Sequence, residues 1–200
     1  MKVKAATLSA RSAWLFTFFA FIAGCEGEVE CTGTFQQVEG LDRSAIVRAL
    51  NEELKDDDLR RNFSPWYSWM IDTLTRSEND PSLLFPYQPY DSVMVTRTGF
   101  DDQGYFRDEP DETYRLAQKQ VDSLSLLLHD PRPYHWAECG TLVETHVIHY
   151  YCGGRSVARV RVGCDFRQIV CEPWNRLVRM GGLYGPGGEM LQRILVKREA

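Results

Sequence analysis

The chain has no apolar run of the roughly 20 residues that a helix needs to cross a bilayer. It also lacks the Gly-x-Ser-x-Gly and His-Glu-x-x-His patterns, which are typical of serine hydrolases and zinc hydrolases. The cysteines between residues 139 and 171 include no close pair with the spacing of a structural zinc site. From these absences we predict neither a metal site nor a cofactor.

The chain has only four histidines, and their positions do not suggest a shared site. His146 and His149 fall three residues apart in a predicted strand, so we expect their side chains on opposite faces. His129 lies at the end of a predicted helix, and His135 precedes Trp136, where capping or surface roles fit. An enzyme therefore remains an alternative rather than the favoured interpretation.

Basic residues are scarce in the front of the chain. Residues 25–131 hold 22 acidic against 10 basic residues, whereas residues 132–200 hold 6 against 10. The whole chain has a formal net charge of −5. Such an acidic front half argues against nucleic acid as a partner, because nucleic-acid binding needs a basic surface.

A short apolar segment lies close to the start of the chain. Lys2, Lys4 and Arg11 precede an apolar run over residues 13–23, and that run ends in small residues. A basic start, a short apolar core and small residues at its end are typical of a signal peptide for export. The segment is shorter than a membrane-spanning helix.

The end of this segment, Ile22-Ala23-Gly24-Cys25, resembles the lipobox of bacterial lipoproteins. The resemblance covers only the first 25 residues and names no domain family. It implies transfer of a diacylglyceryl group to the sulfur of Cys25, cleavage before Cys25, and often a further acyl chain such as palmitate. Two or more acyl chains anchor a protein stably to a membrane, whereas one does so only marginally. The alternative is an ordinary secretory signal, cut after Gly24 or Cys25, which releases a soluble secreted or periplasmic protein.

The residue after the lipobox bears on the membrane to which the protein is sorted. In bacteria that sort lipoproteins, Asp at this position retains them in the inner membrane, and here the residue is Glu26. The resemblance therefore implies the outer membrane. We expect residues 1–24 to be the signal peptide, residues 25–40 a tether, and residues 41–200 a single α+β domain.

The six cysteines fit an oxidising compartment, where disulfides form. If Cys25 carries lipid, five cysteines remain and one lacks a partner. We favour a bond from Cys139 to Cys164 or Cys171. Cys31 then bonds Cys152 or is the odd thiol.

Helices are predicted mainly in the first two thirds of the chain. Ser44 begins one helical pattern, Ser64-Pro65 begins a second, and Pro110 begins a third that runs to Leu128. The stripe of Trp66, Trp69, Met70 and Leu74 in the second is interpreted as core, with a ligand cradle as the alternative.

A small disulfide-braced antiparallel sheet is predicted in the last third, besides a strand near residues 92–96. Residues 142–152 and 155–164 flank Gly153-Gly154, a two-residue hairpin turn, and a third strand covers 167–171. The turn pairs residues whose numbers sum to 307, which places Tyr150 opposite Val157. This register makes Val147 and Tyr151 core residues and places a second row on the solvent face: His146, Ile148, Tyr150, Cys152, Arg155, Arg159 and Arg161.

Two surfaces are predicted to make contacts. One is the Pro-rich and Tyr-rich segment with Phe85, Tyr87 and Tyr90, for which the alternative is a loop packed on the core. The other is the strip of Arg155, Arg159 and Arg161. We expect a membrane-anchored cell-envelope lipoprotein that binds or scaffolds, with another envelope protein as its partner. The alternative is a soluble secreted enzyme or toxin-like protein with an unrecognised active site.

Overall fold

The computed structural model describes residues 31–35, 38–99, 103, 107, 109–136, 142–163, 165–179 and 182–195. Within these ranges the chain forms four α-helices, a short 3-10 helix (Pro81–Leu83) and one five-stranded antiparallel sheet. The predicted mixed α+β class is confirmed. In the same ranges, no helix is both long enough and apolar enough to cross a membrane.

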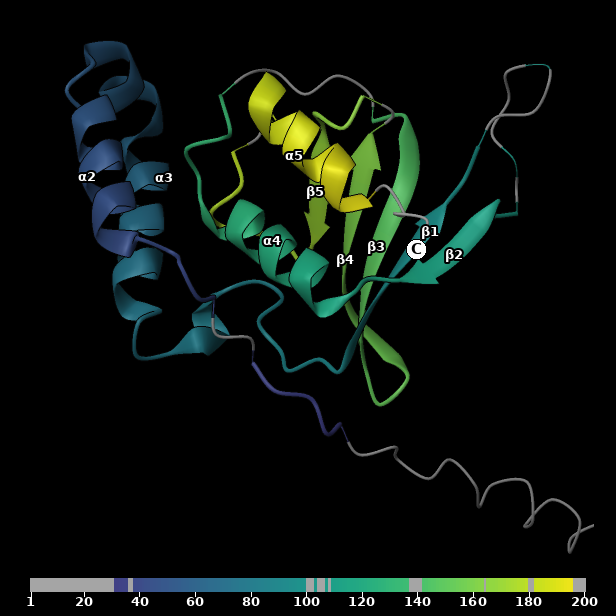
Figure 1. Ribbon diagram of the computed structural model, residues 1–200. Helices are drawn as coiled ribbons and strands as arrows, with labels where there is room; N and C mark the ends of the chain where they lie inside the picture. Colours follow the sequence, from purple (N-terminus) through teal and green to yellow (C-terminus); the bar gives the residue numbers. More distant parts are fainter. Residues whose placement is uncertain are drawn as a thin grey trace, which may run out of the picture. The chain divides into compact units, whose positions relative to one another are not determined.

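The sheet has the strand order β2-β1-β3-β4-β5 (Figure 1). Most helical residues precede most strand residues, as predicted, but the sheet is larger than expected because β1 and β2 join it, and α5 (Gly185–Leu195) follows the last strand. The strands are β1 (Ser92–Arg97), β2 (Glu112–Arg115), β3 (Glu144–Cys152), β4 (Arg155–Gly163) and β5 (Ile169–Glu172).

Aspartate caps set the starts of α2 (Arg43–Glu53) and α3 (Asp57–Arg76). The carboxylates of Asp42 and Asp56 accept hydrogen bonds of 2.8–3.0 Å from backbone N–H groups two or three residues later. The prediction that the second helix begins at Ser64-Pro65 is wrong, because Asp56 already caps that helix two turns earlier.

The helix α4 (Gln118–His129) begins later than the predicted start at Pro110. The intervening residues form β2, and Tyr114 packs against the core from the sheet. The Gln120 side chain accepts a hydrogen bond of 3.0 Å from the Ala117 N–H and closes the first turn of α4. Pairing with β1 therefore overrides the helical spacing of these residues, because tertiary contacts outweigh local propensity.

β3 and β4 form the predicted hairpin, but a bulge shifts its register. The first two pairs after the turn follow the prediction, whereas Tyr150 then pairs with Ala158 instead of Val157. One extra residue on β4 reverses the predicted faces of β3, because side chains alternate along a strand. The side chains of β3 that were predicted to face solvent are therefore buried. They are His146, Ile148, Tyr150 and Cys152.

Among the described residues, the core consists of two hydrophobic clusters. The larger lies between the sheet and the helices α4 and α5, which cover the same face of the sheet (Figure 1). The smaller joins α2 and α3 to buried residues from other segments, including Leu84 and Leu177. α4 serves both clusters, since Leu124 and Leu128 belong to the larger and Leu126 packs against the smaller.

Residues 31–35, which fall in the predicted tether, lie against the domain. Thr34 forms an antiparallel bridge with Tyr90. At Gly33 an added Cβ would lie 2.5 Å from the backbone of Tyr90, so only glycine permits this approach. The chain is therefore fixed to the domain before α2 begins.

Candidate functional site

The predicted aromatic surface at residues 85–90 is largely interior. Phe85 is buried and its ring centroid lies 5.5 Å from that of Tyr150, edge to face. Tyr90 is half-buried, its ring lies 5.0 Å from the same tyrosine, and burial raises its pKa to about 12. The prediction of an exposed recognition segment is therefore wrong for Phe85, because these rings fill the end of the sheet core.

The three predicted contact arginines lie at the hairpin and along the outer face of β4. Arg155 is exposed beside the turn. Arg159 pairs with Glu172, and Arg161 lies 3.0 Å from Glu172 and 3.5 Å from Glu144. Acidic neighbours thus balance two of the three charges, which weakens this strip as a site for an anionic partner.

The cysteines are only partly within the described residues. The sulfur atoms of Cys31 and Cys152 are in bonding contact, with a Cα–Cα distance of 5.0 Å that fits disulfide geometry. Cys171 is a free, buried thiol, and burial raises its pKa. Of the two pairings predicted for Cys139, the one with Cys171 is therefore not found. Cys25, Cys139 and Cys164 lie outside the described residues.

The histidines occupy separate environments. His146 lies on the core face of β3 and His149 on the other face, as the spacing predicts. His129 is buried, its Nε2 lies 2.8 Å from the Phe85 carbonyl oxygen, and burial lowers its pKa to about 4. Among the described residues, no group of three histidine, cysteine or acidic side chains is placed to hold a metal ion.

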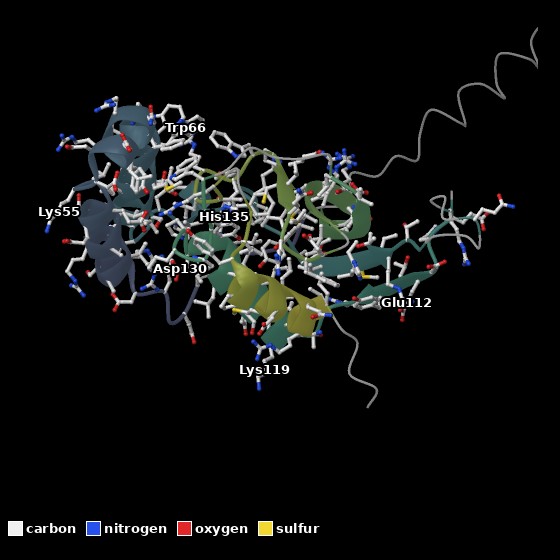
Figure 2. The ribbon with its side chains drawn as sticks, turned by 90° about the horizontal axis from the view of Figure 1, so that it is seen from above. Lys55, Trp66, Glu112, Lys119, Asp130 and His135 are labelled. Carbon is white, nitrogen blue, oxygen red and sulfur yellow. A yellow bond between two sulfur atoms is a disulfide. The ribbon has the colours of Figure 1, made fainter. Side chains whose placement is uncertain are left out.

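The most distinctive surface feature is a set of three tryptophans from two distant segments. Trp69 on α3 and Trp174 after β5 are 55% and 43% exposed, which is unusual for such large apolar side chains. Trp66 lies between them, with ring centroids 5.5 Å from Trp69 and 4.9 Å from Trp174, both edge to face. We call Trp66, Trp69 and Trp174 the tryptophan surface; Figure 2 labels Trp66 on α3.

Hydrogen bonds hold the loop that carries Trp174. The buried Asn175 donates from Nδ2 to the Leu128 carbonyl oxygen at 2.8 Å. The Tyr87 hydroxyl donates to the Trp174 carbonyl oxygen at 3.0 Å and accepts from the Arg176 N–H at 3.2 Å. Tyr87, predicted as a contact residue, therefore supports the tryptophan surface from within.

A second layer of rings supports Trp66 from behind. The rings of Phe63 and Trp136 stack with centroids 4.4 Å apart, and Trp136 lies 6.2 Å from Trp66. Edge-to-face and stacked ring pairs fix side-chain orientation and contribute about 0.5–1.5 kcal/mol each beyond burial. The exposed rings thus stand on a packed base, and little conformational entropy remains to be lost when a partner covers them.

A hollow of about 440 Å³ opens beside the two exposed rings. Its lining combines the rings of Trp69 and Trp174 with Asp72, Thr73 and Arg176. Asp72 lies 3.3 Å from Arg76 on the same helix. The hollow therefore offers aromatic faces with a carboxylate and a guanidinium at their edge, a combination that can bind an apolar side chain and orient polar groups beside it.

The sequence pattern around two of the three tryptophans predicts the wrong environment. Trp66 and Trp69 are three residues apart on one helix face, and such a stripe is usually core. Trp174 follows Pro173 in a loop, and nothing in its spacing places it beside α3.

Comparison with protein-family models, with curated proteins and with solved structures finds no match to this chain.

Proposed function

We propose that this chain is an exported lipoprotein of the bacterial cell envelope, anchored through Cys25 and binding another envelope protein through the tryptophan surface. The anchor rests on the resemblance of Ile22-Ala23-Gly24-Cys25 to a lipobox at the end of an export signal. The binding role rests on one observation, the exposure of Trp69 and Trp174 on a packed aromatic base.

The contact between Cys31 and Cys152 is consistent with export. We propose that it is a disulfide, because such bonds persist in oxidising compartments such as the periplasm. The bond would tie the segment next to the proposed anchor to the edge of the β3–β4 hairpin. A pull on the anchor would then be transmitted to the sheet rather than to α2.

A protein partner fits the tryptophan surface better than the membrane does. Trp and Arg dominate the binding energy of protein interfaces, and both line the hollow. The carboxylate of Asp72 lines it too and would be repelled by the anionic headgroups of a bilayer. The rigid support of the rings lowers the entropy cost of docking.

Replacement of Cys25 by Ser tests the anchor. Without the thiol no diacylglyceryl group can be attached, so we expect loss of palmitate label and loss of the chain from the membrane fraction. The Cys31→Ser variant removes a nearby cysteine and should retain the label. If Cys25→Ser matures normally and stays in the same membrane fraction, the anchor does not exist.

Photo-crosslinking in living cells tests the partner surface. A photoreactive phenylalanine analogue in place of Trp69 or Trp174 should yield an adduct with the same envelope protein. Tyr184 is a matched control, because it is 54% exposed but lies just before α5. Adducts from all three positions alike, or from Tyr184 alone, would contradict the proposal.

Once the crosslinks have identified the partner, affinity provides a second measure. Trp69→Ala and Trp174→Ala should each weaken binding by roughly 2 kcal/mol, the loss expected for an interface hot spot. Their effect on stability should be smaller than that of truncating a fully buried aromatic residue, because the two side chains are 55% and 43% exposed. Unchanged affinity in both variants would place the interface elsewhere.

A further inference from the structure

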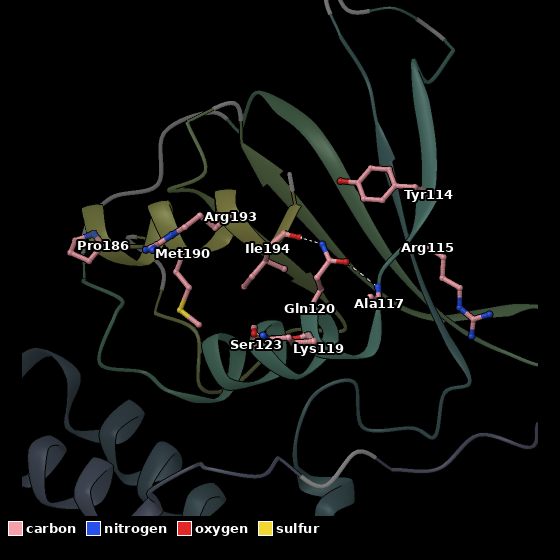
Figure 3. Close-up of a pocket in the computed structure, with 10 residues that line it drawn as sticks. All are labelled: Tyr114, Arg115, Ala117, Lys119, Gln120, Ser123, Pro186, Met190, Arg193 and Ile194. Atoms are coloured by element: carbon pink, nitrogen blue, oxygen red, sulfur yellow. Dashed lines mark hydrogen bonds between the residues drawn. The ribbon is translucent and has the colours of Figure 1, made fainter. Parts of the chain in front are cut away.

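A second hollow, separate from the tryptophan surface, lies between α4 and α5. Its volume is about 770 Å³, within the range of roughly 300–1,000 Å³ that is typical of small-molecule sites. Figure 3 shows Met190 and Ile194 extending from α5 toward α4, which carries Lys119 and Gln120. We call this hollow the α4–α5 groove.

Three hydrogen bonds fix the width of the groove at one end. The Gln120 side chain accepts from the Ala117 N–H and donates to the Ile194 carbonyl oxygen at 2.6 Å, so it links the start of α4 to the end of α5 (Figure 3). The Tyr114 hydroxyl donates to the Leu195 carbonyl oxygen. The groove is therefore preformed, since strand β2 and both helices are bonded to one another at this end.

The inner wall of the groove is apolar and adaptable. Ile194 is buried beneath it, and Met190 is half-buried against the larger core cluster. A thioether side chain has three rotatable bonds and fits itself to irregular apolar ligands. A hydrocarbon chain could lie along this wall and be removed from water, at a gain of about 0.8 kcal/mol for each buried methylene.

The rim of the groove is basic. Lys119 and Arg193 are exposed along it, and no aspartate or glutamate is among the described residues that line it. Arg115 also lines the groove, but its side chain turns away (Figure 3) and donates to the Asp91 carbonyl oxygen at 3.1 Å. The Arg193 Nε donates to the Glu189 carbonyl oxygen at 3.2 Å, a backbone contact that leaves its charge uncompensated by that bond. In a chain of net charge −5, two exposed bases on a lining whose described residues include no acid are a local reversal of sign that favours an anion.

We propose that the α4–α5 groove binds a single-chain anionic amphiphile of the fatty-acid class. The hydrocarbon chain lies on Met190 and Ile194, and the carboxylate is paired with Lys119 and Arg193. The groove differs from the tryptophan surface in residues and in chemistry, so this proposal does not depend on the proposed partner. In Figure 2, Lys119 and Trp66 lie toward opposite sides of the view.

Calorimetric titration with laurate, below its micelle concentration, tests the proposal. The full chain carrying Cys25→Ser is used, so that no acyl chain on residue 25 competes for the groove. We expect saturable binding of laurate. Hexanoate should bind at least about tenfold more weakly, because its shorter chain buries less hydrocarbon. Dodecyl maltoside should also bind at least about tenfold more weakly, because it has the same chain but no charge. A single-chain phosphate ester distinguishes carboxylate recognition from recognition of any anionic head. Equal binding of laurate and dodecyl maltoside, or no saturable binding of laurate, overturns the proposal.

Charge reversal identifies the groove as the place of binding. The double variant Lys119→Glu, Arg193→Glu should weaken laurate binding by at least about tenfold, the loss of roughly 1.4 kcal/mol in pairing. The matched control is the double variant Arg48→Glu, Arg60→Glu, which changes the net charge by the same amount. Both arginines are exposed on α2 and α3 and neither lines the groove, so the affinity of this variant for laurate should stay unchanged. Equal losses in both variants would show a non-specific charge effect and overturn the proposal.

Amide chemical shifts give an answer that does not depend on any variant folding. On titration of laurate, the amides of α4 and α5 near Gln120 and Ile194 should shift together and saturate. Shifts confined to α3 or to the outer face of the sheet would place the ligand elsewhere and overturn the assignment of the groove.

Discussion

Replacement of Glu53 by Gln is expected to lower the free energy of unfolding by about 3 kcal/mol. Removing one partner of a buried ion pair typically costs roughly 3–5 kcal/mol, because the remaining charge stays in the protein interior. The lower end of that range applies here, since the Glu53 side chain is 32% exposed whereas Arg179 is only 5% exposed.

This ion pair fixes the α2–α3 hairpin to the rest of the domain. Arg179 lies 2.8 Å from Glu53 and donates to the Tyr134 carbonyl oxygen at 3.2 Å. Its guanidinium also lies over the rings of Tyr67 and Trp136, at 5.3 and 5.9 Å. The network therefore joins both helices to the segment before β3 and the segment before α5.

Tyr67 completes the network. Its hydroxyl donates to the Glu53 carboxylate at 2.5 Å, and burial, followed by that bond, raises its pKa to about 12. In the Glu53→Gln variant, Tyr67 retains an oxygen acceptor. The decrease in the free energy of unfolding therefore reports mainly the missing negative charge beside Arg179.

Equilibrium unfolding in urea measures the effect. Glu52→Gln is the matched control: Glu52 is the neighbouring residue and pairs with Lys55, but both side chains are more than two thirds exposed. A surface pair of this kind contributes about 0–1 kcal/mol. Equal losses in the two variants would mean that the Arg179 network does not stabilise the fold as described.

The stability of the domain is expected to fall as the pH is lowered from about 6.5 to about 4, because of His129. Its pKa is lowered to about 4 from an unfolded value of 6.5, chiefly by burial. Between these two pH values the unfolded chain binds a proton that the folded chain excludes, so stability rises with pH across the window. The gain in the free energy of unfolding from His129 is complete above about pH 6.5. It amounts to about 3 kcal/mol, because the pKa differs by between two and three units between the folded and unfolded chain.

Urea unfolding of wild type and His129→Gln at pH 7 and pH 5 isolates this contribution. Gln can still donate to the Phe85 carbonyl oxygen but does not titrate in this range. The pKa values of His146 and His149 are lowered too, so part of the pH dependence should remain in the variant. An unchanged slope of stability against pH in His129→Gln would show that the buried imidazole is not its source.

The fold was predictable where the local signal was strong. The hairpin at Gly153-Gly154 and the strand near residues 92–96 follow from turn chemistry and alternation. The faces of β3 were not predictable, because a single bulge at Val157 reverses them and leaves the sequence pattern of both strands intact. Likewise, the prediction placed the start of α3 at Ser64, which is a good helix cap, whereas the structure uses Asp56, an equally good cap two turns earlier.

The candidate site was less predictable than the fold. Phe85 and Trp69 have similar sequence contexts of mixed aromatic and polar residues, yet one is buried against Tyr150 and the other is exposed. The difference arises from long-range packing, since Trp66 and Trp174 come together across more than a hundred residues. No local pattern contains that information.

An intact-mass measurement of the chain extracted from membranes tests the proposed anchor most directly. We predict a polypeptide that begins at Cys25 and carries the added mass of a diacylglyceryl group, with or without a further acyl chain on its amino terminus. A polypeptide without any lipid mass, whether it begins at Cys25 or elsewhere, would contradict the account.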